Sequence, residues 1–265
     1  MTQTAAAGGD LLFATEEAVG LVTFNRPQAR NALTFEMYEG LATICREAGR
    51  ENALRALIVT GAGGKSFAAG TDISLFRNFD GRKDGLAYEQ KMEKVLHDIE
   101  SCVVPTIAAI SGACTGGGAA IAAACDVRLA TRDIKFGVPI ARTLGNCLSI
   151  GNLHRLSSAL GASLAREILL TSRLIEAEEA ERIGLASEFF DDAGAMMARA
   201  RELARQMTAF APLTIRATKK GFARLARGGA DAKDDDLIAL CYGSEDFREG
   251  LDAFLAKRKP EWKGR

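Results

Sequence analysis

The chain has 265 residues, of which 48% are hydrophobic, so it can bury a sizeable core in one large domain or in a domain with an appendage. Its 34 Lys and Arg residues are balanced by 34 Asp and Glu residues, which disfavours nucleic acid or an anionic membrane as a partner. No apolar run approaches the roughly 20 residues that cross a bilayer, and the start MTQTAAAGGD does not resemble a signal peptide. We therefore expect a cytoplasmic protein.

The six cysteines are scattered, and no two of them form a CxxC pair. Most lie in apolar or Ala-rich surroundings, which is typical of buried free thiols in a reducing compartment. This pattern predicts neither disulfides nor a metal site.

Short strand-like runs alternate with longer helical runs over the first two thirds of the chain. The spacing of apolar residues and the capping residues predict these elements in order: a hairpin from 11–14 and 19–25, a helix from the N-cap Thr34 to about residue 50, a buried strand at 56–60, a short helix capped by Asp72, a helix at about 84–100, and strands at 106–110, 127–130 and 186–190. Such an alternation predicts an α/β layered core.

The pattern changes to nearly pure helix from about residue 193. We expect helices at 193–209, 212–227 and 234–257, broken by Pro212 and by Gly228-Gly229. Helices with an apolar stripe and no sheet of their own often pack on another surface. We therefore divide the chain into an α/β core at 10–200 and a helical C-terminal oligomerisation region at 201–265.

Two Gly/Ala-rich turns each follow a buried strand and open a helix: SFAAGTD at 66–72 and GACTGGGAA at 112–120. A helix start leaves backbone N–H groups without intrahelical partners, and glycines let a ligand oxygen approach them. Two such amides on one oxygen would stabilise an enolate or tetrahedral intermediate by roughly 3–4 kcal/mol per donor. A single GGG run more often reflects helix–sheet packing, but two matched turns favour a shared oxyanion site.

These turns belong to a series of motifs that resembles the enoyl-CoA hydratase/isomerase (crotonase) superfamily. The run IAAISGACTGGGAAIAAACDV at 107–127 resembles the signature of that family. NRPQARNAL at 25–33, FAAGTD at 67–72, FGVP at 136–139 and the C-terminal EG…F…KRKP at 249–260 resemble its other conserved segments in the same order. The resemblance implies a crotonase-like spiral of repeated ββα units with a C-terminal helical region, assembled as a homotrimer or homohexamer.

The same resemblance implies an acyl-CoA thioester as substrate. It places the oxyanion donors on the backbone N–H groups of Thr71 and Gly117. Coenzyme A is then part of the substrate, so no separate cofactor is expected. Its CoA moiety would lie near Gln28, Arg30, Ala69 and Lys263, and the Lys263 side chain could reach the CoA phosphate of a neighbouring subunit.

The sequence departs from the hydratases of the family at both catalytic carboxylates. Those enzymes use two glutamates as general base and acid, and the corresponding positions here hold Ala120 and Ile140. A shift in register cannot supply them, because no Asp or Glu occurs in 101–125 or in 134–166. The two-carboxylate hydration of a 2-enoyl-CoA is therefore not supported.

Polar but non-acidic residues fill the segment PIARTLGNCLS at 139–149. Arg142 would pair with a carboxylate on the substrate, and Asn146 would bind the acyl chain or a water molecule. Thr143 and Cys147 are further candidates, although no His lies beside Cys147 in sequence. All four are equally compatible with helix-end or packing roles.

Two classes of function remain open. The first is an enzyme that forms a thioester enolate and carries out decarboxylation, hydrolysis or isomerisation. The second is an acyl-CoA-binding relative or subunit that has lost catalysis. A serine hydrolase is disfavoured, because the sequence has no GxSxG elbow.

Overall fold

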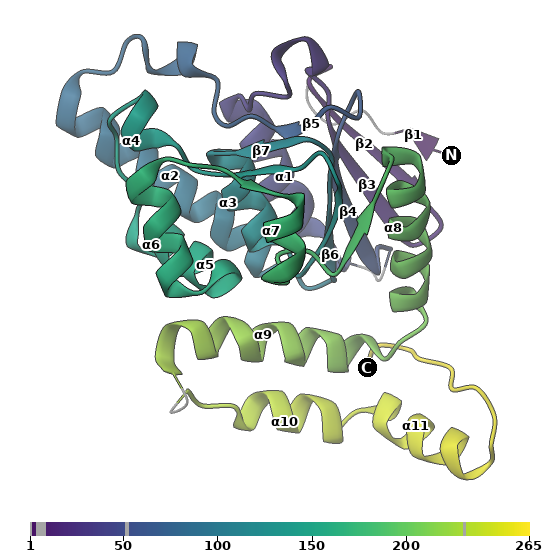
Figure 1. Ribbon diagram of the computed structural model, residues 1–265. Helices are drawn as coiled ribbons and strands as arrows, with labels where there is room; N and C mark the ends of the chain where they lie inside the picture. Colours follow the sequence, from purple (N-terminus) through teal and green to yellow (C-terminus); the bar gives the residue numbers. More distant parts are fainter. Residues whose placement is uncertain (1, 4–8, 51–52, 230–231) are drawn as a thin grey trace.

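The computed structural model describes residues 2–3, 9–50, 53–229 and 232–265. Two β-sheets and the helices that cover them form one body, and a separate layer of helices lies beside it (Figure 1). The larger sheet has the strand order β1-β2-β3-β4-β6-β8-β11, with bounds β1 Thr2–Gln3, β2 Leu11–Glu16, β3 Val19–Phe24, β4 Ala56–Gly61, β6 Thr106–Ile110, β8 Val127–Thr131 and β11 Glu188–Phe190. The smaller sheet has the order β10-β9-β7-β5, with bounds β10 Ile175–Glu176, β9 Lys135–Gly137, β7 Ala113–Thr115 and β5 Ser66–Ala68.

Three successive units of the chain alternate between the two sheets. The first strand of each unit (β4, β6 or β8) joins the parallel centre of the larger sheet, and the second (β5, β7 or β9) joins the smaller sheet. A helix follows each pair: α2 (Gly81–Glu100), α3 (Gly117–Ala124) and α4 (Ile140–Thr143). The predicted spiral of ββα units is confirmed. Because β5 and β7 are parallel neighbours, the turns that follow them emerge at the same edge.

Neighbouring residues of the central strands face opposite layers, as the pleat requires. Ile58 of β4 packs in a cluster with α8 (Ala193–Thr208), which covers one face of the larger sheet. Val59 belongs to the main core on the other face, together with α1 (Phe35–Glu47), α2 and α3. The remaining helices of this body are η1 (Pro27–Ala29), η3 (Ile73–Phe76), α5 (Ile150–Leu160), α6 (Ala162–Thr171) and α7 (Ala177–Arg182).

The predicted capping residues occupy their expected places. The Thr34 side chain accepts a hydrogen bond from the Met37 N–H at 3.3 Å and begins α1. Asp72 accepts one from the Ser74 N–H at 3.0 Å and begins η3, while Arg26 donates to its other oxygen at 2.9 Å. The Ser74 and Arg26 hydrogen bonds lower the pKa of Asp72, which therefore serves as a charged structural cap.

The C-terminal part differs from the prediction in two ways. First, α8 is one helix packed on the larger sheet, so the predicted boundary between 200 and 201 falls inside it; the helices that stand apart begin with α9 (Pro212–Gly228). Second, the single helix expected at 234–257 is wrong, because α10 (Asp235–Tyr242) and α11 (Glu245–Leu255) are separate. Ser244 caps α11 by accepting from the Phe247 N–H at 3.0 Å.

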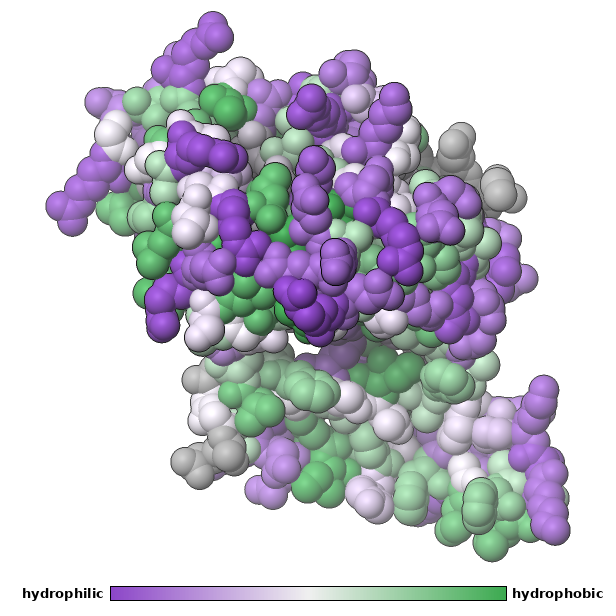
Figure 2. Space-filling view, in the orientation of Figure 1, coloured by the Kyte–Doolittle hydropathy of each residue, from purple (hydrophilic) through white to green (hydrophobic). Residues whose placement is uncertain are grey.

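The helices α9 to α11 expose an unusual amount of apolar surface. Figure 2 shows apolar residues gathered over this layer. Their exposed members are Phe222, Leu225, Ile238, Tyr242, Phe247, Leu251, Phe254 and Leu255. Among the described residues, no helix is both long and apolar enough to cross a membrane.

The cysteines follow the prediction for most positions. Four of them, Cys45, Cys102, Cys114 and Cys125, are buried free thiols, whereas Cys147 is exposed and Cys241 is half-buried. Within the described ranges no group of His, Cys, Asp and Glu side chains is arranged to hold a metal ion.

Candidate active site

A cavity of about 190 Å³ lies where the two Gly-rich turns meet the helices that cover the smaller sheet. Its walls come from α1, from the turns after β5 and β7, from one face of α2 and from the segment 138–148. The predicted residues Ala69, Thr71, Gly117, Ala120, Ile140, Thr143 and Asn146 all line it.

The turn after β5 directs the N–H of Thr71 away from the neighbouring chain segment. Thr71 forms an isolated parallel bridge with Leu33. The two bonds of that bridge run from the Leu33 N–H to the Gly70 oxygen at 2.8 Å and from the Asp72 N–H to the Leu33 oxygen at 2.9 Å. Both hydrogen bonds use the residues that flank Thr71. The N–H of Thr71 itself therefore points away from Leu33.

The turn after β7 presents a second amide. Gly116 has φ 54° and ψ −120°, a conformation that favours glycine, and it turns the chain sharply into α3. Gly117 is the first residue of α3, so its N–H has no acceptor within the helix. A side chain at Gly117 would force its neighbours to move, because a β-carbon would lie 1.8 Å from the Tyr38 hydroxyl oxygen.

The two turns approach each other closely. A β-carbon on Gly70 would lie 4.0 Å from the Gly117 nitrogen, and one on Gly116 would lie 3.3 Å from the Gly70 α-carbon. Thr71 and Gly117 both line the same cavity. The structure thus brings together the two positions predicted from the sequence, with the positive end of α3 beside them.

Three hydroxyl groups form a chain beside this amide pair. The Thr71 Oγ1 atom lies 2.9 Å from the Tyr38 hydroxyl and 2.9 Å from the Tyr88 hydroxyl. Tyr38 is 2% exposed, and burial is the main cause that raises its pKa, so it stays protonated. Burial also raises the pKa of Tyr88, with the Thr71 hydrogen bond acting in the opposite direction.

Counting the protons of this chain shows that one donor remains free. Three hydroxyls carry three protons, and the two hydrogen bonds between them use two. Whichever way the bonds run, the third O–H can donate to another acceptor. A ligand oxygen at the amide pair would be such an acceptor. Neither tyrosine was predicted from the sequence, because Tyr38 and Tyr88 lie 33 and 17 positions from Thr71 and meet it only through the fold.

Apolar side chains occupy the positions at which the resemblance places the two glutamates. Ala120 and Ile140 line the cavity, and Glu89 of α2 is the one carboxylate among the described lining residues. Burial raises the pKa of Glu89, a hydrogen bond from the Ser149 main chain partly offsets this, and the charge of Glu93 raises it further. Sequence reasoning missed Glu89, since it lies on an amphipathic helix that carries many charged residues.

The segment after β9 contributes only part of its predicted polar set. Thr143 and Asn146 line the cavity, whereas Arg142 and Cys147 are exposed and do not line it. Asn152 of α5 lies at the same cavity, and its buried Oδ1 atom has no hydrogen-bond partner among the described residues. That oxygen is available to a donor on a ligand or water.

The predicted CoA-binding residues are divided between two places. Ala69 lines the cavity, and its N–H donates to the Arg30 carbonyl oxygen at 3.1 Å. The side chains of Gln28 and Arg30 are exposed. Lys263 lies in the C-terminal tail, where its N–H donates to Asp246 at 2.7 Å. The structure therefore does not bring Lys263 to the other three within this chain.

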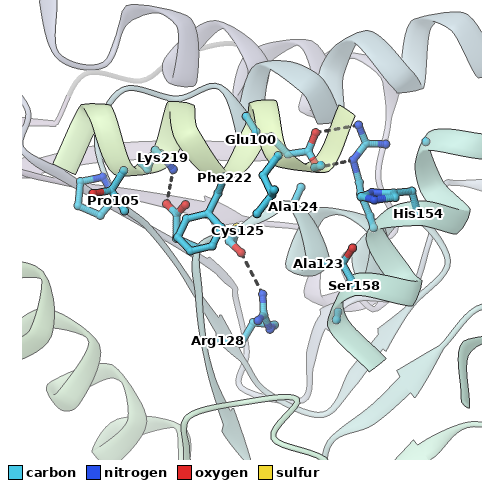
Figure 3. A pocket seen from close by; sticks show the side chains of 18 of the residues that line it. Glu100, Pro105, Ala123, Ala124, Cys125, Arg128, His154, Ser158, Lys219 and Phe222 are labelled. Carbon is cyan, nitrogen blue, oxygen red and sulfur yellow. Dashed lines mark hydrogen bonds and ion pairs between the residues drawn. The ribbon is translucent and has the colours of Figure 1, made fainter. Parts of the chain in front are cut away.

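A second and larger cavity, of about 1090 Å³, separates α9 from the body of the protein. Figure 3 shows Lys219 and Phe222 of α9 reaching over it toward Cys125 and Arg128. Its cationic side chains have partners within the chain: Lys219 pairs with Asp126, and Arg128 donates to the Cys125 carbonyl oxygen at 2.9 Å. It contains neither of the two amides, so we assign the chemistry to the smaller cavity.

Comparison with known proteins decides the family. The family model described as enoyl-CoA hydratase/isomerase matches residues 14–265. The chain belongs to the enoyl-CoA hydratase/isomerase family.

Individual relatives of this family are similar over nearly their whole length. The short-chain-enoyl-CoA hydratase of Clostridium acetobutylicum is 33% identical over 258 residues, which cover 95% of this chain and 97% of that protein. The 2,3-dehydroadipyl-CoA hydratase of Escherichia coli is 32% identical, with 97% and 99% covered. The crystal structure of an enoyl-CoA hydratase/carnithine racemase from Magnetospirillum magneticum superposes with a TM-score of 0.89 at 34% identity, covering 99% of this chain and 97% of that one.

Proposed function

We propose that this member of the enoyl-CoA hydratase/isomerase family binds an acyl-CoA thioester with its carbonyl oxygen between the Thr71 and Gly117 amides and stabilises the enolate formed there. The supporting observation is the close approach of the two turns, with a β-carbon on Gly70 only 4.0 Å from the Gly117 nitrogen. Two amides that point at one oxygen in a preorganised site stabilise developing charge far more than water does. The free O–H of the hydroxyl chain supplies a third donor.

The reaction we favour is a proton transfer on the acyl chain. Hydration by two carboxylates needs a pair of acidic side chains, and Ala120 and Ile140 line the cavity where the resemblance places that pair. An enolate, by contrast, requires one base and an oxyanion site. Short acyl groups of the kind named for the Clostridium acetobutylicum relative suit the cavity of about 190 Å³.

Isotope-edited infrared spectroscopy tests the oxyanion site directly. Crotonyl-CoA with ¹³C at the thioester carbonyl should show a lower C=O stretching frequency when bound than when free, because hydrogen bonds weaken the carbonyl bond. The Gly117→Ala variant, whose new methyl group would lie 1.8 Å from the Tyr38 hydroxyl oxygen and so displace the second amide, should lose the shift while retaining its circular dichroism spectrum. If the wild type binds crotonyl-CoA without lowering its C=O stretching frequency, the proposal is contradicted.

A turnover assay separates an enzyme from a binding protein. Wild-type protein is incubated with a panel of saturated, 2-unsaturated and 3-unsaturated acyl-CoA thioesters, and the products are analysed by mass spectrometry. Conversion of at least one thioester is the expected result. A carbonyl shift without conversion of any of them would favour the acyl-CoA-binding alternative.

We further propose that α9 to α11 serve in assembly into a trimer or hexamer. Phe254, at 82% exposure, Leu255, at 71%, and Phe222, at 68%, are large apolar groups that a monomer would leave in water. Light scattering after size-exclusion chromatography should give a mass of three or six chains. A Phe254→Asp variant should shift the protein to a smaller species, whereas a purely monomeric wild type would refute the assembly.

A further inference from the structure

Glu89 lines the same cavity as the amide pair. Tyr88, Glu89, Met92 and Leu96 all line the cavity, so one of its walls is one side of α2. The wall is close to the first turn, because the Tyr88 hydroxyl lies 2.9 Å from Thr71 Oγ1. Glu89 is the one carboxylate among the described residues that line the cavity.

The charge of Glu89 acts on both ends of the hydroxyl chain. Burial is the main cause that raises the pKa of Tyr38 and of Tyr88, and the negative charge of Glu89 adds to it at each of them. The Tyr38 hydroxyl lies against Gly117, and the Tyr88 hydroxyl is hydrogen-bonded to the Thr71 side chain. The carboxylate therefore lies within electrostatic reach of the groups on either side of the proposed thioester oxygen.

The surroundings of Glu89 leave its carboxylate available for chemistry. Glu93, one turn further along α2, is held by two hydrogen bonds from Arg155 of α5, at 2.7 and 2.8 Å. Glu89 has no salt bridge among the described residues; the Ser149 main chain is its hydrogen-bond partner. A half-buried carboxylate without a cation holds its proton more readily than a carboxylate in water, which suits it to accept and return one.

We propose that Glu89 is the proton-transferring residue of this enzyme, acting from α2 in place of the carboxylates that Ala120 and Ile140 replace. It has this role only if the acyl-CoA function proposed above holds. The C–H bond next to the thioester carbonyl breaks, an O–H bond forms on Glu89, and the electron pair moves to the thioester oxygen between the two amides. Return of the proton to the same carbon gives exchange, and return to the γ-carbon of a 3-enoyl thioester gives the conjugated 2-enoyl isomer.

Deuterium exchange tests this role with simple probes. Full-length protein is incubated in D₂O with butyryl-CoA or but-3-enoyl-CoA, and label at the carbon next to the carbonyl is followed by mass spectrometry and NMR. We expect Glu89→Gln to lower the exchange rate about 10²-fold or more, and Glu89→Asp to restore part of it. Glu178→Gln, which neutralises an exposed carboxylate on α7, should exchange like the wild type.

The pH dependence distinguishes a proton acceptor from a structural residue. The wild-type rate should rise with pH as Glu89 loses its proton, with a midpoint above 4.5, and Glu89→Gln should lack this limb. The facing groups that can perturb it are Glu93 and Arg155, which remain paired, and the hydroxyls of Tyr38 and Tyr88, which stay protonated.

Binding measurements keep the two proposals separable. Calorimetric affinity for butyryl-CoA should change less than threefold in Glu89→Gln. Equal exchange in wild type and Glu89→Gln, or no exchange by a wild type that binds both thioesters, would overturn the role of Glu89 alone. A wild type that binds butyryl-CoA no better than free CoA would overturn the acyl-CoA function, and the role of Glu89 with it.

Discussion

The Tyr38 hydroxyl lies 2.9 Å from Thr71 Oγ1, on the side of the cavity where Gly117 has no side chain. This relationship couples α1 to both turns that carry the amide pair. The Tyr38 hydroxyl oxygen fills the space that a side chain at Gly117 would need. The same oxygen is hydrogen-bonded to the side chain of Thr71, which lines the cavity.

Removing the Tyr38 hydroxyl should reduce turnover more than binding. Tyr38→Phe removes the hydroxyl that lies against Gly117 and leaves only Thr71 and Tyr88, so a donor beside the second amide is lost. A hydrogen bond to a charged group contributes roughly 1.5–3 kcal/mol, which corresponds to about a 10- to 100-fold lower kcat. Steady-state kinetics on an acyl-CoA that turns over provides the measurement. Tyr242→Phe, at a tyrosine that is 66% exposed, is the matched control; equal kcat values for both variants would contradict a role for the Tyr38 hydroxyl.

The contact between Gly117 and Tyr38 also predicts an energetic coupling. In Gly117→Ala the new methyl group would lie 1.8 Å from the Tyr38 hydroxyl oxygen but 3.1 Å from the ring carbon that bears it. Tyr38→Phe should therefore relieve most of the strain that Gly117→Ala introduces. A double-mutant cycle measured by urea unfolding should give a coupling energy of about 1–3 kcal/mol. Additive effects of the two substitutions would show that the backbone moves apart instead.

The local elements of this fold could largely be predicted from the sequence. The caps at Thr34 and Asp72 and the apolar strand at 56–60 are specified by neighbouring residues, and the structure has them where they were expected. The division at residue 200 failed because the amphipathic pattern of α8 does not reveal which surface it packs on. The break at Ser244 was missed because its capping bond to Phe247 spans only three residues within a continuous helical pattern.

The candidate site was predictable where it depends on the backbone and unpredictable where it depends on side chains from distant elements. Two Gly-rich turns predicted a shared oxyanion site, because an exposed amide needs only a turn and a helix start, and the family resemblance placed its donors at Thr71 and Gly117. Tyr38 and Glu89 are unremarkable positions on amphipathic helices. Only the packing of α1 and α2 against the turns brings them to the cavity.

Asn152 should tolerate an apolar replacement of similar size. Its side-chain oxygen is buried and lacks a partner among the described residues, and such an atom costs about 1–3 kcal/mol. Asn152→Leu should therefore leave the free energy of unfolding in urea unchanged or increase it. If the ligand supplies the missing donor, the same variant should bind its acyl-CoA more weakly. A loss of several kcal/mol in the absence of ligand would indicate that the oxygen is bonded to a buried water.

The stability of the protein at low pH should depend on Arg155, whose side chain is 5% exposed. It binds Glu93 and Glu100 through hydrogen bonds of 2.7 to 2.9 Å. The Arg155 hydrogen bond is the main cause that lowers the pKa of Glu93 below 4.5, with burial acting against it. A carboxylate with a lowered pKa stabilises the fold fully above its unfolded-state pKa, and this contribution is lost as pH falls through the folded-state value.

Replacing Arg155 should remove both the pairing and its pH dependence. Arg155→Met leaves two carboxylates without their buried partner, which should cost about 3–5 kcal/mol near neutral pH. As the pH falls below about 4.5, the wild type should lose stability faster than the variant, since Glu93 in the variant no longer resists protonation. Urea unfolding at several pH values measures both effects. Parallel stability curves for the two proteins would mean that the pairing with Glu93 adds nothing to the fold, and that the buried Arg155 acts through its packing alone.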